Sequence, residues 1–129
     1  MKKIILDTNF LLIPSQFKVD IFEEIKRICN FKYELCIIDK TVEELNNIIK
    51  TQPQKQKMHA KLALSIIKKY KIKQINTTLE TNVDSLILRT VTKNHIVATQ
   101  DIELKRILKE KRIPLIYLRQ KQFLELKEY

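Results

Sequence analysis

The chain has 129 residues, 44% of them hydrophobic, which suits a single folded domain over residues 1–129 and excludes a disordered chain. It contains no glycine. This excludes a glycine-rich phosphate loop and a dinucleotide-binding fingerprint, because both need a backbone approach that only glycine allows. With 25 Lys and Arg against 15 Asp and Glu, the formal charge is +10, so a polyanion is a natural partner.

The expected elements alternate between strands and helices. Short apolar runs predict strands, and apolar residues three or four positions apart predict helices. In chain order we expect strand 4–7, helix 19–29, strand 34–39, a helix that starts at Thr41, helix 53–70, strand 72–76, helix 80–92, strand 95–99, helix 101–111 and strand 114–118. The last segment, 121–129, is expected to be a short helix or a tail that binds a partner.

Most of these strands are continuous apolar runs rather than alternating ones, so both faces of the sheet should be covered. We therefore expect a parallel sheet between two layers of helices. In such a sheet, ligands bind at the carboxyl ends of the strands. Because glycine is absent, turns should use other residues, and Asn30, Asn76 and Asn94 are expected in left-handed turn positions.

Four carboxylates are expected at that edge of the sheet. Asp7 ends the first strand, and Asp101 lies two residues after Thr99, which ends strand 95–99. Glu44 and Asp84 lie in the first turns of helices that follow other strands. Since the strand ends and the starts of the following helices share one edge, the four acids should face the same side of the molecule.

Clustered carboxylates repel one another, and two of them within ~4 Å cost roughly 4 kcal/mol at an effective dielectric constant near 20. A hard divalent cation with oxygen ligands, Mg²⁺ or Mn²⁺, would offset this repulsion. Each acid alone also has a structural interpretation. Asp7 can cap a turn, Asp101 can cap its helix, and Glu44 can form a capping box with Thr41. Asp84 borders the apolar side of its helix, which favours a functional role.

The positive charge is concentrated between Leu45 and Leu79, where there is no acidic residue. This stretch carries eight lysines: Lys50, Lys55, Lys57, Lys61, Lys68, Lys69, Lys71 and Lys73. It is either a solvated helix face or a surface that faces phosphates. No apolar run is long enough to cross a membrane, and Asp7 interrupts any signal-like segment, so we expect a cytoplasmic protein. Cys29 and Cys36 are expected to be buried free thiols.

Five segments of the chain, in order and with similar spacing, resemble the PIN domain family. They read "IILDTNFLL", "TVEELNNI", "VDSLIL", "IVATQDIELKRIL" and "IPLIYLRQ". In particular the chain is similar to small archaeal PIN nucleases related to those that process small-subunit ribosomal RNA. The resemblance implies a three-layer α/β/α sandwich with a parallel five-stranded sheet. It also implies a metal-dependent endoribonuclease that cleaves single-stranded RNA.

The resemblance also implies roles for individual residues. The catalytic acids would be Asp7, Glu44, Asp84 and Asp101, and the ligands of Mg²⁺ or Mn²⁺ would be Asp7, Asp84 and Asp101. Asn9 and Thr99 would support these acids through hydrogen bonds. Glu43 is a rival to Glu44, which we prefer because the Glu-Leu pattern of the family matches Glu44 and Leu45. RNA contacts are expected from Lys55, Lys57, Lys61 and Arg119.

The sequence departs from the family pattern in three places. Gln100 stands where Asn is usual, Asn94 and His95 stand where a glycine is common, and Asn82 and Ser85 replace a further acid near Asp84. These changes are expected to weaken a second metal site but leave the four acids in place. Arg119 has a second interpretation, an ion pair with Glu103 or Glu125. His59 is expected to be an exposed helix residue.

Two other functions that place an acid after the first strand do not fit the sequence. A phosphatase with an Asp-x-Asp motif is excluded by Asn9, and a receiver domain lacks its paired acids at the first strand. A PIN-fold module that binds RNA or ribosome-assembly proteins without cutting remains the alternative. Among nucleases, ribosomal RNA processing and a toxin-type ribonuclease are both open. The implied partners are RNA, a second copy of the chain, and an antitoxin or ribosome-assembly proteins.

Overall fold

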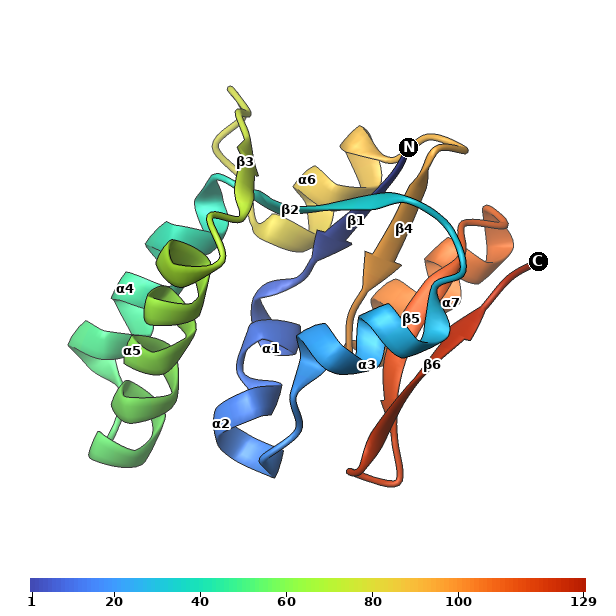
Figure 1. Cartoon of the computed structure of the whole chain (residues 1–129). Coiled ribbons are helices and arrows are strands. Elements are labelled where there is room, and N and C mark those ends of the chain that lie inside the picture. The colour runs from blue at the N-terminus through green and yellow to red at the C-terminus, as the bar shows by residue number, and fades with distance from the viewer.

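The computed structural model describes all residues from Met1 to Tyr129 and shows one six-stranded sheet with helices on both faces (Figure 1). In chain order the elements are β1 (Lys2–Leu6), α1 (Thr8–Leu11), α2 (Ile13–Phe17), α3 (Ile21–Ile28), β2 (Tyr33–Ile38), α4 (Lys40–Thr51), α5 (Gln54–Lys69), β3 (Lys73–Ile75), α6 (Val83–Thr90), β4 (His95–Ala98), α7 (Ile102–Glu110), β5 (Leu115–Arg119) and β6 (Phe123–Lys127). None of the helices combines the length and apolar character needed to cross a membrane.

The strand order is β3-β2-β1-β4-β5-β6, and every neighbouring pair is parallel except β5 and β6. The predicted α/β/α sandwich with a parallel sheet of five strands is confirmed, with a sixth, antiparallel strand added. The prediction of a helix or tail at 121–129 is wrong. The turn before β6 places Gln120 and Lys121 at φ 54° and 57°, positions that Asn-Gly or Gly-Gly would normally mark in a sequence.

The core consists of two clusters, one on each face of the sheet. Alternate residues of β1 face opposite sides, so Ile4 and Leu6 belong to the larger cluster and Ile5 to the smaller one. The larger cluster packs the sheet against helices α1 to α5, and the smaller one packs it against α6 and α7. The helices in front of and behind the sheet in Figure 1 are these two outer layers.

Several local predictions need correction. The N-cap of α4 is Asp39, whose Oδ1 accepts a hydrogen bond from the backbone N–H of Lys40, while Thr41 is fully buried inside the helix. None of the three asparagines predicted in left-handed turns has a positive φ. The residues that do are Lys18, Lys71, Arg112, Gln120 and Lys121. Cys29 and Cys36 are buried free thiols, as predicted.

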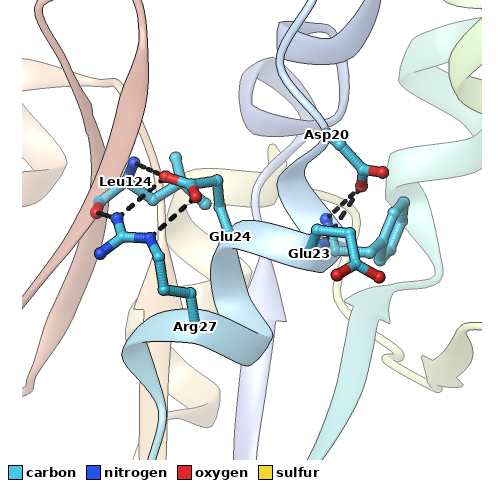
Figure 2. Close-up of polar contacts among 6 residues, drawn as sticks. Asp20, Glu23, Glu24, Arg27 and Leu124 are labelled. Carbon is cyan, nitrogen blue, oxygen red and sulfur yellow. Dashed lines mark hydrogen bonds and ion pairs between the residues drawn. The ribbon is translucent and has the colours of Figure 1, made fainter.

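Helix α3 is fastened to the outer edge of β6 by side chains (Figure 2). Asp20 caps the helix by accepting from the backbone N–H groups of Phe22 and Glu23 at 3.1 Å. Glu24 Oε1 accepts from the Leu124 N–H at 2.9 Å, and Arg27 Nη2 donates to the Leu124 carbonyl at 3.1 Å. This pair occupies the outward backbone N–H and C=O of Leu124, which hinders pairing of the β6 edge with another chain at this residue.

Candidate active site

The centre of the sheet contains a switch point in strand order. β1 and β4 are neighbours, with Leu6 paired to Ala98, but the chain leaves β1 toward β2 and leaves β4 toward β5, in opposite directions. Such a switch point opens a crevice at the carboxyl ends of the strands. Asp7 and Thr99 are the residues that directly follow the two strands, so both lie at this crevice.

Asp7 is buried, with 2% of its surface exposed. Its Oδ1 accepts from the Thr8 backbone N–H at 2.8 Å, and its Oδ2 accepts from the Thr99 hydroxyl at 2.6 Å. The pKa of Asp7 is raised from 3.8 to about 6, chiefly by burial and also by the negative charges of Asp84 and Glu44, while the hydrogen bonds from Thr99 and Thr8 oppose the rise. The side chain therefore lies in a negative environment that favours a cation.

The Thr99 hydroxyl connects the first and fourth acids. It donates to Asp7 and accepts from the backbone N–H of Asp101 at 3.0 Å. Asp101 is the N-cap of α7, and its Oδ1 accepts from the Leu104 N–H at 2.8 Å. The loop between them is held on its other side by Asn9, whose Oδ1 accepts from the Gln100 N–H at 3.2 Å. These bonds fix the position of Asp101 relative to Asp7.

The structure distinguishes between Glu43 and Glu44. Glu44 Oε1 accepts from the Thr8 hydroxyl at 2.6 Å, and its Oε2 lies 3.4 Å from the Val83 N–H at the start of α6. Glu43 points to solvent, with 69% of its side chain exposed, and pairs with Lys40 at 3.4 Å. Glu44 is therefore the acid at the crevice.

Thr8 is a site residue that the sequence did not reveal. It is buried, its backbone N–H donates to Asp7, and its hydroxyl donates to Glu44, so it holds two of the acids at once. The only feature of the sequence that could have indicated Thr8 was its position between Asp7 and Asn9, immediately after a buried strand. Many threonines occupy such turns for local reasons, and only the packing of α4 against α1 brings Glu44 to this one.

Asp84 completes the group from the first turn of α6. Its carboxylate makes no hydrogen bond or ion pair, and burial together with the charges of Asp101 and Glu44 raises its pKa. A pocket of about 280 Å³ brings three of the four acids together, and Asp101 joins them through Thr99 and through its charge on Asp84. The pocket is lined by Asp7, Thr8, Asn9, Leu12, Glu44, Ile48, Asn82 and Asp84.

The donor groups of this site are hard oxygens, which fit Mg²⁺ or Mn²⁺ rather than a softer metal. No three Asp, Glu, His or Cys side chains are grouped tightly enough to form a ready-made ligand set. Magnesium is usually held by one or two carboxylates and keeps several of its waters, so it does not need three converging acids. The residues present therefore fit a hydrated divalent cation, and Asp7 with Asp84 would hold it from the pocket side.

The predicted RNA contacts differ in their surroundings. Lys55 and Lys61 are exposed on α5, Lys57 is partly exposed, and none of the three forms a salt bridge. Arg119 pairs with Glu125 at 2.9 Å, which was its second interpretation. The prediction for His59 is wrong, because α5 packs on α2 and buries His59 against the Ser15 hydroxyl.

Comparison with known proteins identifies the family. Residues 4–121 match the family described as PIN like domain. The chain is 38% identical over 130 residues to the ribonuclease VapC4 of Methanocaldococcus jannaschii, covering 98% of this chain and 97% of that protein. It is 29% identical over 117 residues to the rRNA-processing protein fcf1 of Schizosaccharomyces pombe, covering 88% of this chain but only 57% of the yeast protein.

Solved structures agree with this assignment. The PIN domain endonuclease Utp24 superposes with a TM-score of 0.81 at 27% identity, over 98% of this chain and 92% of that one. A domain of a functionally unknown protein from Methanocaldococcus jannaschii shares the fold, with a TM-score of 0.61 at 17% identity over 92% of each chain. The chain therefore belongs to the PIN-like domain family, and the resemblance to PIN domain nucleases carried by its sequence motifs is confirmed.

Proposed function

We propose that this protein is an endoribonuclease that uses Mg²⁺ or Mn²⁺ to hydrolyse phosphodiester bonds in single-stranded RNA. The proposal is carried by Asp7, a buried carboxylate at the strand switch point whose pKa is raised by burial and by the charges of Asp84 and Glu44. Asp7 also caps α1 through the Thr8 N–H, but a cap does not require burial of its charge, so its placement is best explained by a function that needs the negative charge.

The residues of the pocket divide the chemical work. The bonds from Thr8 and Thr99 fix both Asp7 oxygens, so the carboxylate is oriented before any ligand arrives. Asp7, Asp84 and Asp101 would hold the cation, and Glu44 completes the negative cluster. A bound Mg²⁺ or Mn²⁺ supplies charge stabilisation at the phosphate and a water of lowered pKa. Asp84 has no partner within the chain, so its carboxylate is available to orient or deprotonate the attacking water.

Exposed lysines supply the attraction that RNA needs to approach an acidic pocket. Lys55, Lys57 and Lys61 on α5 would contact backbone phosphates. Because Arg119 is already paired with Glu125, it would contribute only by exchanging that partner. Two relatives, one named as a ribonuclease and one as an rRNA-processing protein, support RNA as the substrate class. We therefore keep ribosomal RNA processing and a toxin-type ribonuclease as the two cellular roles, with an antitoxin, ribosome-assembly proteins or a second copy as partners.

The test is cleavage of an end-labelled single-stranded RNA by the purified protein, by Asp7→Asn and by Glu43→Gln. We expect cleavage with Mn²⁺ or Mg²⁺ and none with EDTA. Asp7→Asn should lose roughly 100-fold or more in rate, the scale on which a preorganised electrostatic group acts. Glu43→Gln, which changes the adjacent exposed acid, should cleave like the unchanged protein.

Two results would contradict the proposal. Equal cleavage by the unchanged protein and Asp7→Asn would show that the activity does not come from this pocket. RNA binding without any metal-dependent cleavage would support the alternative, a PIN-fold module that binds RNA or ribosome-assembly partners without cutting.

A further inference from the structure

A second groove, which we call the α7 groove, runs between α7 and the β5–β6 pair and has a volume of about 370 Å³. Its eight lining residues include four cations and no acid. They are Ile102, Lys105, Arg106, Lys109, Leu115, Tyr117, Lys127 and Tyr129. A groove that combines basic and aromatic side chains in this way is typical of surfaces that bind single-stranded nucleic acid.

The apolar part of the α7 groove is open to solvent. Ile102 has 82% of its surface exposed and Tyr129 has 41%. Lys105 lies over the ring of Tyr117, with its Nζ 5.2 Å from the ring centroid. Flat apolar and aromatic surfaces of this kind can stack against a nucleobase, whichever base it is.

The cations of the α7 groove are largely available to a ligand. Lys105, Lys109 and Lys127 form no salt bridge in the structure. Arg106 differs, because it is paired with Glu103 at 2.5 Å and with Glu110 at 2.8 Å. Three unpaired ammonium groups around an apolar floor match a strand that alternates phosphates with bases.

The α7 groove begins where the acidic cluster ends. Asp101 caps α7, Ile102 is the next residue, and Lys105 lies one turn further along the same helix. Lys105 is close enough to Asp101 for the two charges to interact. Burial lowers the pKa of the Lys105 ammonium group, and the negative charge of Asp101 partly opposes that effect. A strand whose phosphate lies at the acids would therefore reach the α7 groove with its neighbouring nucleotides.

We propose that the α7 groove binds the single-stranded RNA segment next to the cleaved phosphate, with one base against Ile102 near the acids, another stacked on Tyr129 further along the groove, and phosphates held by Lys105, Lys109 and Lys127. This inference rests on the proposed function, and it states where the RNA on one side of the cleaved phosphate binds. A second copy of the chain is a poor occupant, because each copy carries a formal charge of +10.

The experiment measures binding of a short fluorescent single-stranded RNA by anisotropy, in an Asp7→Asn background so that the RNA stays intact. Lys105→Gln with Lys109→Gln is compared with Lys26→Gln with Lys32→Gln, which removes two exposed lysines elsewhere. We expect the first pair to weaken binding about tenfold and to lower the salt dependence by about 0.7 for each lost phosphate contact. The second pair should change affinity less than twofold.

Stacking is tested separately. Tyr129→Ala should weaken binding roughly fivefold or more, while Tyr129→Phe, which keeps the ring, should bind like the parent. Circular dichroism spectra should show that each variant is folded. RNA carrying a photoreactive base should cross-link to peptides that contain Ile102 or Tyr129.

The possible failures can be told apart. If the Asp7→Asn parent binds no RNA, the proposed function fails together with this inference. If the parent binds RNA and the α7 groove variants bind like the Lys26 and Lys32 control, the proposed function stands and the α7 groove is excluded as the RNA path. If poly-glutamate binding requires the α7 groove lysines and RNA binding does not, the α7 groove serves an acidic protein partner and the inference is overturned.

Discussion

The two halves of the acidic pocket differ in how firmly their carboxylates are held. Asp7 and Glu44 accept hydrogen bonds from threonine hydroxyls at 2.6 Å, Asp7 from Thr99 and Glu44 from Thr8. Asp84 accepts no hydrogen bond at all, and Asp101 uses one oxygen to cap α7. The carboxylates of Asp7 and Glu44 are therefore oriented before a ligand arrives. Asp84 and Asp101 retain oxygens that can turn toward an ion or a water molecule.

This difference explains how the chain tolerates the acid cluster. Asp7 is the one fully buried acid of the cluster, and the Thr99 hydroxyl offsets part of the cost of its burial by lowering its pKa. Asp84 is only partly buried, but burial and the charges of Asp101 and Glu44 raise its pKa as well, and no hydrogen bond opposes them. A site built in this way needs little rearrangement at Asp7 and leaves the adjustment to Asp84. The predictions below test this division.

The largest expected effect is on stability. The pKa of Asp7 in the folded chain is about 6, against 3.8 without the fold, so folding favours the protonated carboxyl. Its contribution to stability is present below about pH 4 and is lost as the pH rises through 6. Asp7→Asn removes this titration and should gain up to about 3 kcal/mol over the unchanged protein between pH 4 and pH 8.

Urea unfolding in EDTA at the two pH values measures this gain, and Glu43→Gln serves as the control that should show no such pH-dependent difference. If the difference in the free energy of unfolding between Asp7→Asn and the unchanged protein stays constant from pH 4 to pH 8, the pKa of Asp7 is not raised by folding.

The next effect concerns the Thr99 hydroxyl. Thr99→Val keeps the shape of this buried side chain but removes its bonds to Asp7 and Asp101, so RNA cleavage should fall roughly 10- to 100-fold. Thr99→Ser should restore most of the rate. Thr90→Val makes the same chemical change in α6, where the hydroxyl bonds only the Leu86 carbonyl, and should leave cleavage unchanged. Equal rates for the two valine variants would argue against a positioning role for Thr99.

The smallest effect is electrostatic. Because the charge of Asp84 raises the pKa of Asp7, Asp84→Asn should lower that pKa, by less than the effect of burial. Carboxyl carbon chemical shifts followed by NMR over the pH range report it directly. Glu43→Gln should leave the pKa of Asp7 unchanged. A shift as large as that caused by Asp84→Asn would mean that the pKa of Asp7 responds to the overall charge of the protein and not to Asp84 in particular.

Local pattern was enough to place most of the pocket at one edge of the sheet. Asp7 and Asp101 follow apolar strands, and Glu44 and Asp84 lie in the first turns of helices after other strands, so their shared edge follows from strand direction alone. The lysines of α5 were also visible as a stretch without acids. These features depend on residues close to one another in the chain, and sequence periodicity records such features well.

Other parts of the site depend on contacts between distant residues. The bond between Thr8 and Glu44 spans 36 positions, and no local pattern marks the Thr8 hydroxyl. The bond between Asp7 and Thr99 spans 92 positions, and Thr99 was expected at the site only through the family resemblance. His59 was misjudged for the same reason, since its burial comes from Ser15 on another helix. The α7 groove forms only because β6 folds back along β5.

The sequence by itself determined the alternation of strands and helices, the family, and the edge at which the acids gather, because periodicity, motif spacing and the positions of the acids after strands can be read from neighbouring residues. The family pattern already favoured Glu44 over Glu43 and pointed to Thr99, and the tertiary structure showed how each is held. The tertiary structure alone decided that Thr8 holds two of the acids and where a basic aromatic groove opens beside them. Adjacent positions on a helix point about 100° apart, so the choice between Glu43 and Glu44 depends on what packs against α4.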